Sequence, residues 1–443
     1  MKNIVFLNFD YFTKEKTMFF NNVNKILNKD QFKLIILSST DIKSKKFDFY
    51  KLDYKKYYIQ NDLKKIKKIL NFTKKKEREW QSTLQLYYKD KDLEFIKNKI
   101  NSIIYNFLCF LDKHEPTLAI IWTEYHPISA IFKSMCNYFN INYLIAERGI
   151  LNETIVIEKN GLGGKSYITP KKILNNSKTN HYNKFIKINK KLKGKWTHKI
   201  KEYSNKNNIL NKKKTIFFAG TNEIWQGFYP YKNKKTSPLY KSHFELLKEL
   251  SKISKKFENL EVIFKPHPKD RIFKKYKNFI PKNITIYNDV DAIDLIKKSD
   301  LFITISSSLI SDAMFYNKLS LIVGNFEVSN KNICYEVKKK HDLFRFIKLF
   351  YENKLPKKNY KNWKIFINFI LNNYLYNVSK YSFGKLKEAD FVENLLNNIK
   401  LNIYNKKYDK IKKELIKIKY KIFFKDLIKD NIKKLINYEN NLK

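Results

Sequence analysis

Two apolar, β-prone segments of the chain each end in polar groups that suit phosphate chemistry. The first is Ile263-Phe264-Lys265-Pro266-His267-Pro268, and the second is Leu301 to Ile305 followed by Ser306-Ser307-Ser308. The imidazole of His267 can donate a hydrogen bond to a departing phosphate oxygen, and the two prolines fix the turn that presents it. Ligands of α/β sheets gather at the carboxyl ends of parallel strands. The two strand ends therefore predict a nucleotide pocket formed by Lys265, His267, Pro268 and the three serines.

Each of these signals has a simpler interpretation. A His-Pro pair is not specific by itself, since His126-Pro127 also occurs and is expected to lie just ahead of a helix. One serine at a helix start can act as an N-cap. Three successive serines, Ser306 to Ser308, exceed what a cap needs, and their hydroxyls with free backbone N–H groups favour an anion site.

A third candidate site is Glu147-Arg148-Gly149, which follows a buried run. A carboxylate at this strand end can activate an acceptor hydroxyl or stabilise positive charge at a reacting sugar carbon. Arg148 is one of only four arginines in the chain, and a guanidinium suits two-point recognition of a carboxylate or phosphate. The alternative is a structural Glu–Arg pair beside a glycine turn. The nearby run from Gly161 to Ser166 lacks the spacing of a Walker loop, which argues against an ATPase.

Weaker signals complete the inventory of possible sites. Gly220 lies in a turn after an apolar run, where a donor could approach the backbone. Asp289, Asp291 and Asp294 are expected to act as helix-capping charges. No HxH motif, paired strand-end acid or Cys/His cluster is visible, so we expect no metal site and no cofactor other than a donor substrate.

The elements that would position these residues alternate between strands and helices. Apolar runs at 4–7 and 34–37 enclose a helical pattern at 19–27, and a second strand–helix–strand unit spans 118–146. Residues 60–113 are helical in pattern. A new unit begins at Thr215 and continues with helices at 239–256, 292–298 and 309–316 and strands at 262–265, 284–287, 301–305 and 319–323. This α/β pattern predicts two Rossmann-like domains.

The domain boundaries follow from composition. Residues 171–214 are polar and rich in Lys and Asn, and we interpret them as a linker. The predicted domains are 1–205, 206–345 and a C-terminal helical region, 346–443. In 401–443 an apolar stripe lies among 13 Lys and 5 acids, which fits either a helix lying on a membrane surface or one packed on the protein.

The formal net charge of +48 invites a nucleic-acid interpretation, which we discount. Lys is spread along the whole chain, and base readout depends on Arg, which is nearly absent. Three unclustered cysteines fit a reducing compartment. The N-terminal residues lack the pattern of a signal peptide, and no apolar run is long enough to span a membrane. We therefore expect a cytoplasmic protein with possible peripheral attachment to the membrane surface.

In this order the motifs resemble those of the bacterial capsule polysaccharide biosynthesis glycosyltransferases that use CMP-activated Kdo. The likeness covers roughly residues 118–330 and includes a strand-end Glu before glycine, a glycine turn, KPHP and a serine-rich helix start. Bacterial sialyltransferases have a similar set. The resemblance implies a GT-B fold with two Rossmann-like domains facing a cleft, the nucleotide in the C-terminal domain and the acceptor in the N-terminal one. It also implies that Glu147 takes the acidic motif's place, His267 and Pro268 the His-Pro, and Ser306 to Ser308 the serine motif.

One departure matters, because several relatives have two adjacent acids where this chain has Glu147 followed by Arg148. The expected activity is metal-independent transfer of a 2-keto sugar acid such as Kdo from a CMP-sugar to a glycan or lipid-linked acceptor. The expected partners are the donor, the acceptor, the inner membrane surface and capsule assembly proteins. Two alternatives remain: a CDP-polyol phosphotransferase of the teichoic-acid type, and a non-catalytic basic adaptor for membranes or nucleic acid.

Overall fold

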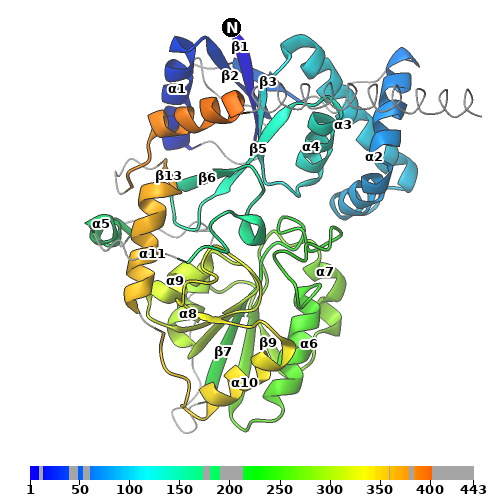
Figure 1. Ribbon diagram of the computed structural model, residues 1–443. Coiled ribbons are helices and arrows are strands. Elements are labelled where there is room, and N and C mark those ends of the chain that lie inside the picture. The colour runs from blue at the N-terminus through cyan, green and yellow to red at the C-terminus, as the bar shows by residue number, and fades with distance from the viewer. Residues whose placement is uncertain are drawn as a thin grey trace, which may run out of the picture. The chain divides into compact units, whose positions relative to one another are not determined.

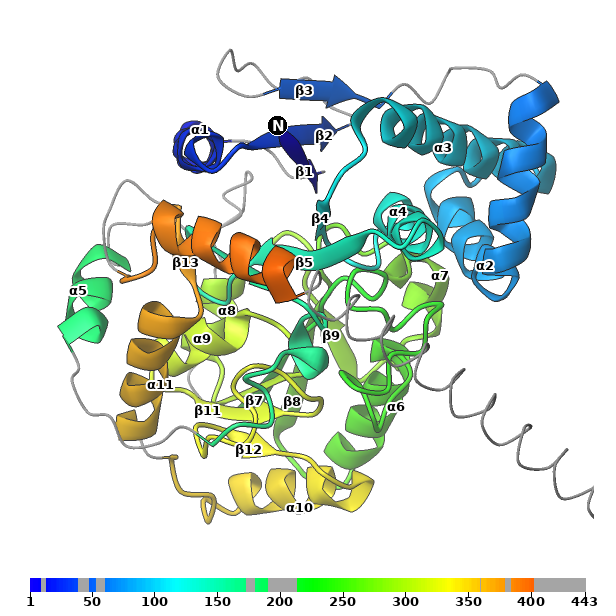
Figure 2. The ribbon, with the colours of Figure 1, turned by 45° about the horizontal axis from the view of Figure 1, so that its top comes forward.

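The computed structural model describes residues 1–8, 13–38, 48–52, 60–172, 180–189, 213–358, 360–378 and 384–401. Its first compact unit, Met1–Phe391, contains two β-sheets, each flanked by helices (Figures 1 and 2). The second unit, Val392–Lys443, is described only over residues 392–401, which are helical. Within the described ranges, no helix combines the length and apolar character that a membrane span requires.

The N-terminal sheet has seven strands in the order β13-β6-β5-β4-β1-β2-β3. The strands are β1 (Lys2–Leu7), β2 (Phe32–Ser38), β3 (Asp48–Lys51), β4 (Leu118–Trp122), β5 (Asn142–Arg148), β6 (Thr154–Glu158) and β13 (Tyr376–Asn377). The first five are parallel, whereas β6 and β13 are antiparallel additions at one edge. The spatial order β3-β2-β1-β4-β5 is that of a Rossmann domain.

Both faces of this sheet are covered, which explains why its central strands β1, β2 and β4 contain continuous apolar runs. Val5 and Leu7 belong to a core shared with the helices on one face, while Phe6 contacts Phe20 of the helix on the other face with ring centroids 4.9 Å apart. The helices are α1 (Lys14–Lys29), α2 (Gln60–Tyr87), α3 (Leu93–His114) and α4 (Pro127–Tyr138). Pro127 occupies the first turn of α4, where its missing N–H has no cost.

The C-terminal sheet has six parallel strands in the order β12-β11-β10-β7-β8-β9. They are β7 (Lys214–Ala219), β8 (Leu260–Lys265), β9 (Ile284–Ile286), β10 (Leu301–Thr304), β11 (Leu319–Ile322) and β12 (Tyr335–Glu336). The connections run outward in both directions from the neighbouring strands β7 and β10. At such a reversal the loops after the two strands diverge and leave a crevice that can bind ligands.

Helices cover both faces of the C-terminal sheet, with α6 on one face and α8 and α9 on the other (Figure 1). The helices of this region are α6 (His243–Ser254), α7 (Phe273–Tyr276), α8 (Ala292–Lys298), α9 (Leu309–Phe315), α10 (Lys340–Tyr351) and α11 (Tyr360–Asn373). Asp291 caps α8, because its carboxylate accepts a hydrogen bond from the backbone N–H of Ile293 at 2.6 Å. This is the capping role expected for that residue.

The predicted fold class is confirmed: the protein is α/β, with two Rossmann-like sheets and C-terminal helices in the GT-B arrangement. One expectation was wrong. Part of the supposed linker forms helix α5 (Asn180–Asn189), whose Tyr182 and Phe185 are buried in the same core as Trp363 of α11. The spacing of Tyr182, Phe185 and Ile186 makes an apolar stripe, which the many Lys and Asn residues around it obscured. Residues 402–443, for which we expect a basic amphipathic helix, lie outside the described residues.

Candidate active site

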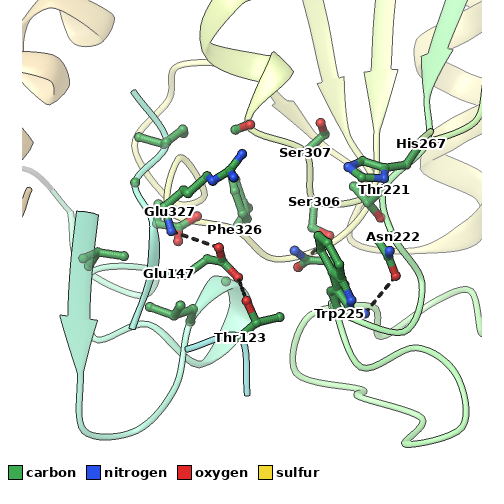
Figure 3. Close-up of a pocket in the computed structure, with 18 of the residues that line it drawn as sticks. Thr123, Glu147, Thr221, Asn222, Trp225, His267, Ser306, Ser307, Phe326 and Glu327 are labelled. Carbon is green, nitrogen blue, oxygen red and sulfur yellow. Dashed lines mark hydrogen bonds between the residues drawn. The ribbon is translucent and has the colours of Figure 1, made fainter. Parts of the chain in front are cut away.

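A cavity of about 250 Å³ lies where residues from both sheets approach one another within the first unit (Figure 3). Seven of the ten residues predicted to form a site line it: Glu147, Arg148, Gly149, His267, Ser306, Ser307 and Ser308. They come from the end of β5, the turn after β8 and the turn after β10. The carboxyl ends of these strands therefore supply one shared pocket.

The carboxylate of Glu147 is held in a fixed orientation. Its Oε2 accepts a hydrogen bond from the hydroxyl of Thr123 at 2.6 Å, and its Oε1 accepts one from the backbone N–H of Arg148 at 2.9 Å. Thr123 follows β4 and adopts a left-handed backbone conformation, with φ 55°. The ends of two neighbouring strands thus position one partly exposed acid in the pocket.

Hydrogen bonding selects one tautomer of His267. The backbone N–H of Lys269 donates to Nδ1 at 3.1 Å, so the proton of the neutral ring resides on Nε2. Desolvation, reinforced by the positive charges of Lys269 and Arg148, lowers the pKa of His267 to about 4. At neutral pH this imidazole is therefore an uncharged hydrogen-bond donor. The indole of Trp225 packs edge-on against it, with ring centroids 6.0 Å apart.

The three serines have different environments. Ser306 is buried and donates to Oε1 of Gln226 at 3.4 Å, and Ser307 Oγ accepts from the backbone N–H of Leu309 at 3.3 Å. Ser308 occupies the N-cap position of α9 but makes no side-chain capping bond. Capping thus involves Ser307, and the pocket is lined by all three residues.

Glu327 is a second acid in the pocket, and nothing in the sequence pattern pointed to it. It lies in a turn after β11, is 6% exposed and lines the same cavity as Glu147 (Figure 3). Its Oε2 has no hydrogen-bond partner among the residues that the structure describes. Burial raises the pKa of Glu327 to about 7, so near neutral pH it is protonated in a large fraction of molecules.

Other lining residues were also missed, because they stand outside the recognised motifs. Asn222 accepts from the backbone N–H of Trp225 at 3.1 Å and donates to the carbonyl of Lys269 at 2.9 Å, which ties the turn after β7 to the turn after β8. His126 is the N-cap residue of α4, as expected, but it also lines the cavity. The signal that could have identified Asn222 was its place directly after a strand at the predicted sheet edge.

Three predicted site residues do not line the pocket. Gly220 donates its N–H to the carbonyl of Lys265 at 2.9 Å, and an added Cβ would meet the ring of Phe264 at 3.0 Å, so it serves the packing of β7 on β8. Lys265 points its ammonium at the carbonyl of Asn288, 2.9 Å away. Pro268 is exposed in the turn that follows His267. The neighbouring Thr221 contributes instead, next to Asn222.

Comparisons with known proteins identify no family for the chain, although a search of solved structures finds distant likenesses. No protein-family model matches the chain, and a search of curated proteins finds no match. Similar solved structures include the β-Kdo 2,7 transferase of Thermosulfurimonas dismutans KpsC, with 14% identity, a TM-score of 0.38, and coverage of 70% of this chain and 97% of that one. The β-Kdo 2,4 transferase of the same protein has 9% identity, a TM-score of 0.40, and coverage of 57% and 79%. A UDP-GlcNAc 2-epimerase of Methanocaldococcus jannaschii has 12% identity, a TM-score of 0.37, and coverage of 90% and 100%.

At these identities and TM-scores none of these structures assigns an activity to this chain. Transferases and epimerases occur together among the similar structures, so the likeness does not distinguish between their reactions. The chemistry has to come from the residues that line this chain's own pocket.

Proposed function

We propose that the protein is a GT-B glycosyltransferase of capsule or surface-glycan assembly that transfers a 2-keto sugar acid, such as Kdo, from a CMP-sugar. One observation carries the proposal: a single pocket at the sheet ends is lined by Glu147, by the neutral imidazole of His267 and by Ser306 to Ser308. The acceptor would be a glycan or a lipid-linked glycan. The resemblance of the motifs to CMP-Kdo transferases supports the choice of donor.

In the proposed reaction the bond between the anomeric carbon and the phosphate oxygen breaks, and the CMP phosphate leaves with the bonding electrons. His267 and the serine hydroxyls donate hydrogen bonds to that phosphate, which stabilises the charge that develops on it. The anomeric carbon forms a new bond to an acceptor hydroxyl, and Glu147 takes up the proton of that hydroxyl. No step requires a metal ion at the phosphate.

Arg148 and Glu327 would orient the donor. The guanidinium of Arg148 suits two-point pairing with the carboxylate of a 2-keto sugar acid. The protonated carboxyl of Glu327 can donate a hydrogen bond to a sugar hydroxyl or ring oxygen. It also brings a second acid to the pocket, although the position after Glu147 is occupied by an arginine.

Two measurements test this function. A thermal-shift screen against CMP, CDP, UDP and GDP should show stabilisation by CMP, because a ligand of the native state raises its apparent stability by mass action. Stabilisation by UDP alone would contradict the cytidine assignment. A transfer assay that compares CMP-Kdo with CDP-glycerol distinguishes the sugar transferase from the polyol phosphotransferase.

The variants Glu147→Gln and Glu352→Gln form a matched pair for the assay. Glu147→Gln should lower kcat by roughly 10²–10⁴-fold while leaving CMP binding intact, because only the proton acceptor is lost. Glu352 lies just after α10 and does not line the pocket, so Glu352→Gln should behave as the parent does. Full turnover by Glu147→Gln would remove the enzymatic role of this carboxylate. A non-catalytic adaptor would be indifferent to both changes.

A further inference from the structure

Behind one wall of the pocket, three residues with metal-binding side chains meet in the protein interior. Glu223 lies in the loop after β7, His243 is the first residue of α6, and Asp270 lies in the loop after β8. One potential ligand atom from each residue lies within 4.8 Å of the others. Glu223 and His243 are fully buried, and Asp270 is 5% exposed.

Each of these side chains has one atom that no hydrogen bond satisfies. Glu223 Oε2, His243 Nδ1 and Asp270 Oδ2 have no hydrogen-bond partner among the described residues. The other carboxylate oxygens are well fixed: Glu223 Oε1 accepts from the backbone N–H of His243 at 3.0 Å, and Asp270 Oδ1 accepts from that of Ile272 at 3.1 Å. A buried polar atom without a partner costs about 1–3 kcal/mol, so three of them together require an explanation.

The environment of the His243 ring is compatible with a ligand role for Nδ1. Nε2 accepts a hydrogen bond from the backbone N–H of Thr221 at 3.3 Å and lies 3.1 Å from the hydroxyl of the same residue. With Nε2 as the acceptor, the proton of the neutral ring lies on Nδ1 in the metal-free protein. A metal ion at Nδ1 would displace that proton, and Nε2 would then carry a proton and donate it to the Thr221 hydroxyl. Nδ1 lies 3.1 Å from Glu223 Oε1, but the contact lacks the direction of a hydrogen bond. A metal-bound histidine commonly donates its other ring N–H to an oxygen in this way.

We propose that Glu223, His243 and Asp270 bind a divalent transition-metal cation of the Zn²⁺ class in a structural site. One imidazole nitrogen and two carboxylate oxygens make a ligand set that suits Zn²⁺, whereas Ca²⁺ and Mg²⁺ prefer oxygen ligands alone. The cation would also balance two carboxylates that are buried with a single imidazole beside them. Glu223 and His243 are 20 positions apart in the chain, and His243 and Asp270 are 27 apart. These separations match no metal-binding sequence motif, so the sequence did not predict the site.

The cation would fix the pocket wall without touching a ligand in the pocket. Its three protein ligands join the loops after β7 and β8 to the start of α6. The backbone N–H of Asp270 donates to the carbonyl of His267 at 2.8 Å, and Thr221, which contacts His243, lines the pocket. This inference does not depend on the proposed reaction, because it concerns only the interior behind the pocket.

The rival occupant of the cluster is a proton. Burial raises the pKa of Asp270 to about 7, so a metal-free cluster would hold a proton there near neutral pH. A proton and a metal ion differ in a simple way. A chelator removes a bound metal ion but leaves a bound proton in place.

The test uses the full chain, freed of any affinity tag and dialysed against a trace of ZnSO₄ and then against metal-free buffer. Elemental analysis should find about one zinc per chain, because the cluster forms a single site. Dipicolinic acid should lower Tm by several degrees, and added Zn²⁺ should restore it. The proposal is wrong if the chain holds far less than one equivalent of zinc and dipicolinic acid does not change Tm. The cluster would then hold a proton.

Variants locate the ion. His243→Asn and Asp270→Asn should lose the zinc and the response of Tm to the chelator. His341→Asn is the matched control. His341 is exposed, and its Nε2 lies 3.6 Å from Oδ1 of Asp342, so it also forms a His–Asp pair. If the ligand variants fold and keep their zinc, the ion lies elsewhere and the proposal is wrong. If they do not fold, the absorption spectrum of the Co²⁺-loaded parent decides, because a site with one nitrogen and two oxygen ligands lacks the thiolate charge-transfer band of a cysteine site.

Discussion

At the scale of single residues, the pocket combines groups whose protonation states differ from those of the same side chains in water. His267 is held neutral by burial, and Glu327 is held partly protonated by the same cause. The type of each side chain could be read from the sequence, but its protonation state depends on how deeply the fold buries it. Glu327 in particular belongs to no motif, and only the folding of the turn after β11 brings it to the cavity.

The low pKa of His267 predicts that nucleotide binding takes up a proton. A phosphate dianion beside the ring favours the imidazolium form and raises the pKa from about 4. The affinity for CMP should therefore increase as the pH falls from 8 towards 6. Titration calorimetry in buffers of different ionisation enthalpy measures the uptake directly, and His267→Asn should abolish it while His341→Asn retains it. Equal uptake in both variants would assign the proton to another group.

The raised pKa of Glu327 predicts an unusual pH dependence of stability. Because the folded protein binds this proton more tightly than the unfolded chain does, the contribution of Glu327 is fully present below about pH 4.5 and is lost as the pH rises through 7. Glu327→Gln cannot ionise, so it should gain stability relative to the parent with rising pH, by up to about 3 kcal/mol above pH 8. Urea unfolding at several pH values measures this difference.

The control residue for that experiment is Glu352, whose pKa is shifted in the opposite direction to that of Glu327. Glu352 is partly exposed, and its hydrogen bond from Lys354 lowers its pKa, so Glu352→Gln should show no gain at high pH. A Glu327→Gln variant whose stability relative to the parent does not change with pH would mean that the folded carboxyl titrates in its ordinary range.

At the scale of elements, the sequence predicted the strands and helices that have strong apolar patterns. The runs at 4–7, 118–122 and 301–305 are so apolar because helices cover both faces of each sheet, and they were recognised for that reason. Helix α5 was missed because only one side of it is apolar and its other residues resemble a linker. The antiparallel strand β6 could not be derived either, since pairing direction depends on the turn at Gly149 to Glu153 and not on strand composition.

The packing of α5 on α11 can be tested directly. Phe185 is 4% exposed, and Tyr182 OH lies 2.7 Å from Tyr360 OH on α11. Phe185→Ala should weaken the docking of α5 by about 3–5 kcal/mol, since it removes a buried ring. Limited trypsin digestion should then cleave near Lys184 and Lys187 well before global unfolding. Lys184→Ala, an exposed change on the same helix, should not accelerate cleavage at Lys187, and an unchanged digestion of Phe185→Ala would contradict the docking.

At the scale of the whole molecule, the charge of +48 is the property that the pocket does not explain. The C-terminal 43 residues carry 13 Lys and 5 acids, and a basic amphipathic segment is attracted to anionic lipid. A chain that ends at residue 400 should therefore co-sediment less with liposomes that contain an anionic lipid, and the difference should shrink in high salt. Neutral liposomes serve as the control. Unchanged partitioning after truncation would favour a segment that packs on the protein.

The chain passes between its two sheets twice. After completing the C-terminal sheet it returns through α11 to place β13 against β6, where Tyr376 pairs with Ile155. A cut in the first passage, between residues 190 and 212, would therefore not release two independent halves, because the downstream fragment still contributes a strand to the upstream sheet. If the chain is divided there and the two fragments are produced separately, they should reassemble when mixed. Neither fragment should fold into a soluble domain when it is produced alone.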